Sequence, residues 1–131
     1  MERKVVAHTL DGHVHKGVTR DFDPGREYFH LLPAEGGGVP LQLEVGGLKA
    51  LFYVKDFLGN KEYDPPPGFG PGKAPGRKCV VTFSDGEVIF GFTPDYVEGS
   101  AGFTLIPSDP ADNNEKIFVS HAAVQRIQFP D

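Results

Sequence analysis

The feature that most constrains this chain of 131 residues is an internal duplication. Residues 3–33 align with residues 77–107 without a gap, so that DGHVHKGVTRDF, beginning at Asp11, corresponds to DGEVIFGFTPDY, beginning at Asp85. After the shared proline the offset grows by two residues, and Leu41 then falls opposite Ile117. Self-similarity over a whole half is typical of repeated structural units. The sequence therefore predicts two units of one fold.

The two halves are separated by a segment rich in proline and glycine. It reads DPPPGFGPGKAPG over residues 64–76. Proline fixes φ and has no amide to give to a sheet, and glycine is poorly suited to strands. We therefore expect a first repeat over residues 1–56, a linker over residues 57–76 and a second repeat over residues 77–131.

Each half has the alternating pattern of β-strands. An Asp-Gly pair between alternating apolar residues, as at residues 11–12 and 85–86, is typical of a two-residue hairpin turn. Such a turn places His8 opposite His15 and points Val14 into the interior. The opening stretch of each repeat is thus predicted to be a hairpin.

The remaining pattern predicts more strands and little helix. Gly17 and Gly91 fall inside strands, where the absence of a side chain permits a bend or a close crossing. Further strands are expected at residues 29–32, 40–45 and 50–54 of the first half and at residues 103–106, 116–119 and 124–129 of the second. The expected fold is all-β, with two tandem five-stranded antiparallel small barrels.

The opening segments, KVVAHTLDGHVHKGVTRDFD and KCVVTFSDGEVIFGFTPDY, resemble the first motif of Sm-like small barrels. SH3-like barrels share this strand pattern. The whole chain is also similar to a family of bacterial proteins of unassigned activity, in which LKALFYVKDF closes the first half and NNEKIFVSHAAVQRI closes the second. The resemblance implies two Sm-like or SH3-like repeats.

The same resemblance argues against the usual ligands of small barrels. Sm-like RNA pockets use an asparagine shortly after the acidic residue and a late Arg-Gly step, and neither stands at the matching positions after Asp21 and Asp95. PilZ receptors for cyclic dinucleotides, which are also small barrels, carry RxxxR and DxSxxG motifs that this chain lacks. The strand pattern leaves Sm-like, SH3-like and PilZ-like barrels open.

The charge of the chain also argues against general binding of nucleic acids. Its formal net charge is −5, and its thirteen basic residues are scattered, whereas affinity for phosphate backbones comes largely from clustered Lys and Arg. A polyanion would have to use the matched basic pairs that open the repeats, which are Arg3, Lys4, Arg77 and Lys78.

No set of residues indicates a reaction, a metal or a cofactor. His8, His13 and His15 could meet on one sheet face, but the second half has Thr82, Glu87 and Ile89 in their places. The only cysteine, Cys79, cannot form a disulfide framework or a thiolate-rich zinc site within the chain. We therefore expect neither enzymatic activity nor a cofactor.

The strongest apolar feature is LKALFYV, which ends the first repeat. Its counterpart AVQRIQF is more polar, so the first version carries a surplus apolar face. That face needs a cover, either the other half of the chain or a partner, including a second copy. The expected interface residues are Leu51, Phe52, Tyr53 and Val54.

The expected setting is the cytoplasm, because the chain shows no secretory signal and no apolar run long enough to cross a membrane. By elimination, the sequence favours a non-catalytic module for protein–protein interaction or regulation. Its partner would be another protein or a second copy. The alternative is a weak nucleic-acid or nucleotide binder of the small-barrel type.

Overall fold

The structure is a computed structural model that describes residues 3–34, 38–57, 76–109 and 112–130. Most of the predicted linker, residues 57–76, lies outside these ranges. The first half contains β1 (Arg3–Thr9), β2 (Val14–Thr19), β3 (Tyr28–Pro33), β4 (Leu41–Glu44), the short 3₁₀ helix η1 (Val45–Gly47) and β5 (Leu48–Val54). The second half contains β6 (Arg77–Phe83), β7 (Val88–Thr93), β8 (Gly102–Pro107), β9 (Asn114–Ser120), η2 (His121–Ala123) and β10 (Val124–Gln128). The prediction of an all-β protein is confirmed.

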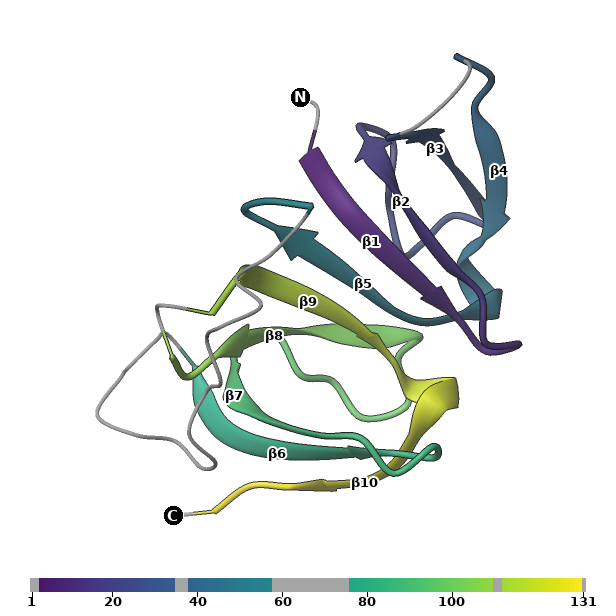
Figure 1. Cartoon of the computed structure of the whole chain (residues 1–131). Coiled ribbons are helices and arrows are strands. Elements are labelled where there is room, and N and C mark those ends of the chain that lie inside the picture. The colour runs from purple at the N-terminus through teal and green to yellow at the C-terminus, as the bar shows by residue number, and fades with distance from the viewer. Residues whose placement is uncertain (1–2, 35–37, 58–75, 110–111, 131) are drawn as a thin grey trace.

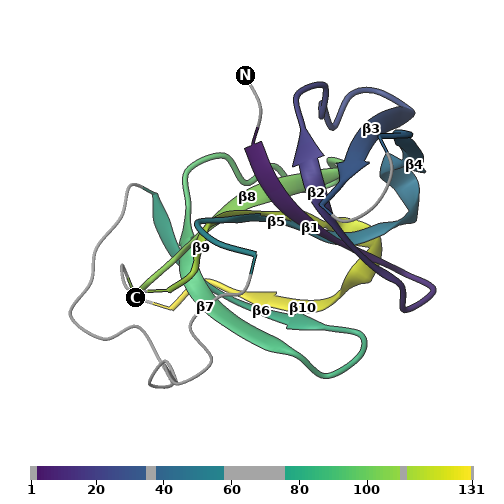
Figure 2. The same ribbon diagram turned by 45° about the horizontal axis from the view of Figure 1, so that its top comes forward.

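The ten strands form one open antiparallel sheet in the order β10-β6-β7-β8-β9-β5-β1-β2-β3-β4 (Figure 1). The order within the first half, β5-β1-β2-β3-β4, is the same as the order β10-β6-β7-β8-β9 within the second. The halves meet where β5 pairs with β9, and β1, β5 and β9 run side by side in both views (Figures 1 and 2). In the part of the chain that the structure describes, no helix is long and apolar enough to cross a membrane.

The opening hairpins have a loop one residue longer than predicted. The Thr9 amide donates to the His13 carbonyl (3.0 Å), and Gly12 adopts φ of +90°. The second half repeats this geometry, because the Phe83 amide donates to the Glu87 carbonyl (2.8 Å) across a glycine at φ of +95°. This arrangement matches a three-residue loop that ends in a left-handed glycine, in place of the two-residue turn.

The longer loop shifts the predicted register by one residue. His8 lies opposite Val14, and His15 lies opposite Ala7. A shift of one residue sends every side chain of a strand to the other face. Val14, which was predicted to point inward, is accordingly 51% exposed, and its counterpart Val88 is 47% exposed. The prediction that His8 and His15 are directly paired is wrong for the same reason.

Glycine in the second strand of each half allows a close crossing of backbones. A Cβ atom at Gly17 would lie 2.2 Å from the Leu32 carbonyl oxygen, and one at Gly91 would lie 2.4 Å from that of Ile106. Neither approach leaves room for a side chain. Both glycines are therefore needed where β2 meets β3 and where β7 meets β8.

We expect Gly17→Ala to lower the free energy of unfolding by about 1–3 kcal/mol, because the added methyl group would overlap the β3 backbone. The control is Gly46→Ala in η1, where a Cβ atom would have no neighbour within 4 Å. Urea denaturation followed by far-ultraviolet circular dichroism measures both changes. Equal stabilities for the two variants would show that the crossing does not require glycine.

Candidate functional site

The pairing of β5 with β9 is the joint between the two halves. It places Leu51 opposite Phe118 and Phe52 opposite Ile117. The four residues predicted to form an interface all lie on β5: Leu51, Phe52 and Val54 are buried, and Tyr53 is half-buried. The chain therefore covers its surplus apolar face with its own second half.

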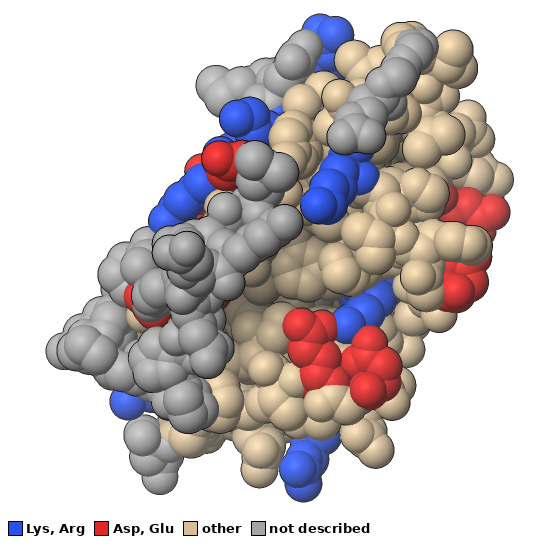
Figure 3. Space-filling view, in the orientation of Figure 1, with Lys and Arg blue, Asp and Glu red and all other residues tan. Residues whose placement is uncertain are grey.

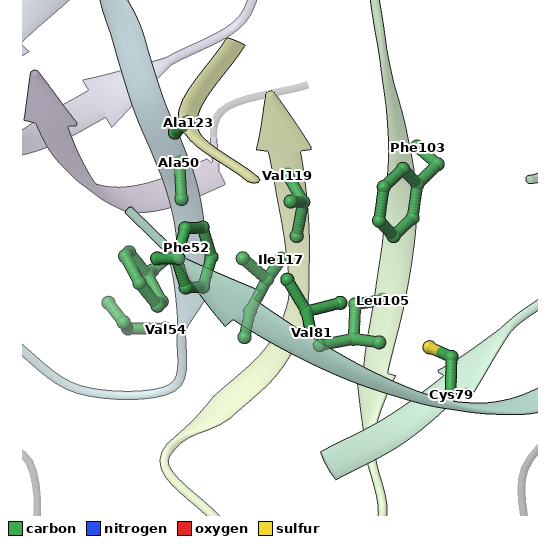
Figure 4. Close-up of a cluster of buried hydrophobic side chains, with 11 residues drawn as sticks. Ala50, Phe52, Val54, Cys79, Val81, Phe103, Leu105, Ile117, Val119 and Ala123 are labelled. Atoms are coloured by element: carbon green, nitrogen blue, oxygen red, sulfur yellow. The ribbon is translucent and has the colours of Figure 1, made fainter. Parts of the chain in front are cut away.

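Each half contributes side chains to the core of the other. Ala50, Phe52 and Val54 of β5 belong to the hydrophobic cluster of the second half, and Figure 4 shows Phe52 close to Ile117. In return, Phe118 of β9 belongs to the cluster of the first half, where its ring centroid lies 5.1 Å from that of Phe22. The joint thus combines backbone pairing with an exchange of apolar side chains.

An ion pair also fixes the joint. The Lys49 ammonium binds the Asp85 carboxylate at 2.8 Å, contacts that of Glu87 and lies 4.6 Å from the centroid of the Phe83 ring. Burial works to lower the pKa of Lys49, but the hydrogen bonds to both carboxylates and their negative charges together raise that pKa. Sequence reasoning missed this residue, although a lysine inside the apolar run LKALFYV was the available signal.

The free edge of β4 corresponds to the edge of β9 that β5 covers. Gln42 stands in β4 where β9 has Phe118, and it is exposed while Phe118 is 6% exposed. Among the described residues β4 pairs only with β3. The first half therefore presents an unpaired strand edge that lacks the aromatic anchor of the joint.

The free edge of β10 corresponds to the edge of β5 that pairs with β9. Arg126 and Gln128 stand where β5 has Ala50 and Phe52, and both are exposed. Within the described ranges β10 pairs only with β6. Polar and charged side chains on edge strands disfavour pairing between copies, so this edge is poorly suited to repeat the internal joint.

Beside Leu41, at the start of β4, lies a hollow of about 440 Å³, which we call the β4 hollow. Val14 and Leu31 contribute apolar wall, and Leu41 opens onto it from β4 itself. His15 and Lys16 of β2 add basic groups to the same wall. The hollow thus combines an apolar surface with basic side chains, and it adjoins the strand that ends the sheet.

A second hollow, of about 230 Å³, contains an aspartate–histidine contact. The Asp21 carboxylate accepts from the His30 amide at 2.9 Å, and its other oxygen lies 2.7 Å from His30 Nδ1. Burial works to raise the pKa of Asp21, but these hydrogen bonds lower it. In the second half Asp95 likewise accepts from the Thr104 amide (2.8 Å). The recurring contact is between carboxylate and backbone, which indicates a role in holding strands together.

The predicted histidines are not gathered around one point. His8 is half-buried with its ring 4.7 Å from that of Phe52, whereas His13 lies at the turn with Nδ1 3.1 Å from Asp11. The rings of His13 and His15 are 6.2 Å apart. Across the described residues, no group of three or more His, Cys, Asp or Glu could hold a metal ion.

The thiol of Cys79 is buried in the second core. Burial raises its pKa to about 12, although the nearby Arg77 charge acts in the opposite direction. The group therefore stays protonated at neutral pH, and a protonated thiol is a poor nucleophile and a poor metal ligand.

The basic residues predicted to contact a polyanion are Arg3, Lys4, Arg77 and Lys78, and they open β1 and β6. In the sheet, β7, β8, β9 and β5 lie between these two strands. Arg3 is paired with Glu115 at 3.0 Å, and Arg77 lies 3.9 Å from the centroid of the Phe129 ring. Figure 3 shows acidic and basic groups interspersed on the face it presents. The structure does not bring the two basic pairs together.

The sequence model of a family of unknown function (DUF6982) matches residues 1–129. The chain belongs to this family. The match extends over both halves and the segment between them. No curated protein and no solved structure matches the chain significantly.

We expect Phe118→Gln, which gives β9 the residue that β4 has, to lower the free energy of unfolding by about 3 kcal/mol or more. The change removes a buried aromatic ring and places an amide in the first core. Gln42→Ala, at the matching exposed position of β4, should change it by less than about 0.5 kcal/mol. Urea denaturation measures both, and a small loss for Phe118→Gln would contradict the exchange of side chains as a main support of the joint.

We also expect the joint to weaken in mild acid. Burial, followed by the charge of Lys49, lowers the pKa of His8, against smaller opposite effects of Glu87 and Asp85. As the pH falls through about 6.5, His8 therefore binds a proton in the unfolded chain before it does so in the folded chain. The free energy of unfolding decreases from this pH downward. Denaturation between about pH 8 and pH 5 should show a smaller decrease for His8→Gln. Identical pH profiles would rule out this contribution.

Proposed function

We propose that the protein is a non-catalytic module for protein–protein interaction. The observation that carries this proposal is the open sheet of the described strands, in which β4 has no partner on its outer side and adjoins the β4 hollow. Unpaired strand edges are a common place for proteins to receive an extended segment of a partner. A regulatory role would follow from the same surface.

We further propose that each half is a five-stranded small barrel of the Sm-like or SH3-like type, over residues 1–56 and 77–131. Three features support this assignment. The halves share one strand order, each has its own hydrophobic cluster, and each has a 3₁₀ turn between its last two strands. Glycine inside a strand permits the sharp bend that closure of a small barrel needs, and Gly17 and Gly91 occupy such positions in β2 and β7.

The chemistry of the described groups supports a non-catalytic role in the cytoplasm. Asp21 and Asp95 both hold backbone amides, and the Cys79 thiol stays protonated. Lys49 is engaged by two carboxylates inside the joint. These groups maintain the fold, and a single buried thiol suits a reducing compartment.

A test of the proposal begins with capture of partners by the full-length chain from a nuclease-treated native extract. We expect a protein that, once purified, binds the purified chain with defined stoichiometry in isothermal titration calorimetry. Failure of every captured protein to bind when purified would count against the proposal.

The competing function is tested in parallel with labelled single-stranded RNA and DNA in fluorescence anisotropy at about 150 mM salt. Because the net charge is −5 and the basic pairs are apart, we expect affinities no tighter than the weak end of the usual non-specific range, about 10⁻⁴ M. Binding below about 10⁻⁶ M that survives this salt would instead support a nucleic-acid binder. Neutralising Arg3, Lys4, Arg77 and Lys78 should then abolish it.

A further inference from the structure

We propose that the edge of β4 is a docking site for an extended segment of a partner protein. The segment adds a strand to β4, directs apolar side chains two residues apart into the β4 hollow and presents a carboxylate to Lys16. This inference rests on the proposed function and names its site and the chemistry of its partner.

The second half of the chain shows what an occupied edge of this kind looks like. There, β9 corresponds to β4, and β5 is the added strand. Ala50 lies opposite Val119 and Phe52 opposite Ile117, and both β5 side chains enter the second core. A small and an aromatic side chain two residues apart are therefore the groups that this type of edge accepts.

Matching residues in the two halves differ in exposure where the added strand is missing. Leu31 and its counterpart Leu105 are both fully buried. Leu41, however, is 37% exposed, while its counterpart Ile117, covered by Phe52, is 1% exposed. The uncovered apolar surface thus lies at the position that the added strand occupies in the other half.

The wall of the β4 hollow differs from its counterpart in charge. His15 and Lys16 stand where the second half has Ile89 and Phe90, and Ile89 packs against the cluster that receives Phe52. The Lys16 ammonium donates to the Phe57 carbonyl at 3.4 Å and has further protons to give. A partner segment that is apolar throughout would leave this charge poorly solvated, so a carboxylate on the segment fits the hollow better.

The position of that carboxylate follows from the strand register. Leu41, at the start of β4, pairs with Leu31 of β3. The Lys16 carbonyl accepts from the amide of Ala34, which follows the last residue of β3, so Lys16 lies beyond the start of β4. β5 runs antiparallel to β9. A strand added to β4 in the same orientation passes Leu43 first and Leu41 second, and then continues beyond the start of β4 toward Lys16. The carboxylate therefore belongs two residues after the side chain that faces Leu41.

A second copy of this chain is a poor occupant. The equivalent strand of another copy is β10, which offers Arg126 and Gln128 where β5 has Ala50 and Phe52. Arg126 would add a positive charge to a site that already contains Lys16.

The test uses fluorescein-labelled peptides that copy residues 47–55 of this chain, one with Val54→Glu and one with Val54→Lys. Fluorescence anisotropy with the full-length protein should show binding of the Glu peptide and at least about 10-fold weaker binding of the Lys peptide. Leu41→Lys should weaken binding of the Glu peptide by at least about 10-fold. The matched control Gln128→Lys, on the other free edge, should leave it unchanged.

A second variant guards against misfolding of Leu41→Lys, which circular dichroism would detect. Lys16→Glu should reverse the preference between the two peptides. Failure of the Glu peptide to bind, equal binding of both peptides, or a loss caused by Gln128→Lys would overturn the proposal. So would self-association of the wild-type chain that Leu41→Lys abolishes, since a second copy would then be the occupant. A purified partner that binds Leu41→Lys undiminished would reject this site while leaving the interaction function intact.

Discussion

The arrangement of the whole chain depends on one antiparallel pairing, between β5 and β9. It turns two five-stranded halves into a single ten-stranded sheet and places Phe118 in one core and Phe52 in the other. Removing either ring would leave a cavity in the core of the opposite half, so the stabilities of the halves are coupled. Lys49 reinforces this coupling, because it is carried by the first half and neutralised by the second.

Much of the fold could be predicted from the sequence because the duplication supplied each pattern twice. The all-β class and most strand positions follow from alternation and from glycine inside strands. The hairpin register could not be predicted, since Asp-Gly suits both a two-residue turn and a three-residue loop that ends in glycine. The hydrogen bonds from the Thr9 amide to the His13 carbonyl and from the Phe83 amide to the Glu87 carbonyl distinguish them, and the longer loop reverses the faces of the following strand.

The candidate site was less predictable, because it is defined by a difference between two strand edges. Among the described strands, β5 covers the outer edge of β9, whereas no strand covers the corresponding edge of β4. The sequence identified Leu51 to Val54 as an apolar surface in need of a cover, and the structure shows that β9 supplies it. The β4 hollow has no motif of its own. Comparing Leu41 with Ile117 indicates a site only once the topology shows that a strand covers one of them.

The exchange of side chains across the joint also affects synthesis of the chain. When β5 leaves the ribosome, Phe52 and Val54 have no core to enter, and the first core still lacks Phe118. From Val54 to Phe118 there are 118 − 54 = 64 further residues to synthesise, which takes roughly 3–13 s at about 5–20 residues per second. During this interval the nascent first half lacks the cover of β9 over its apolar strand, and exposed apolar surface of this kind is prone to aggregation until the second half follows.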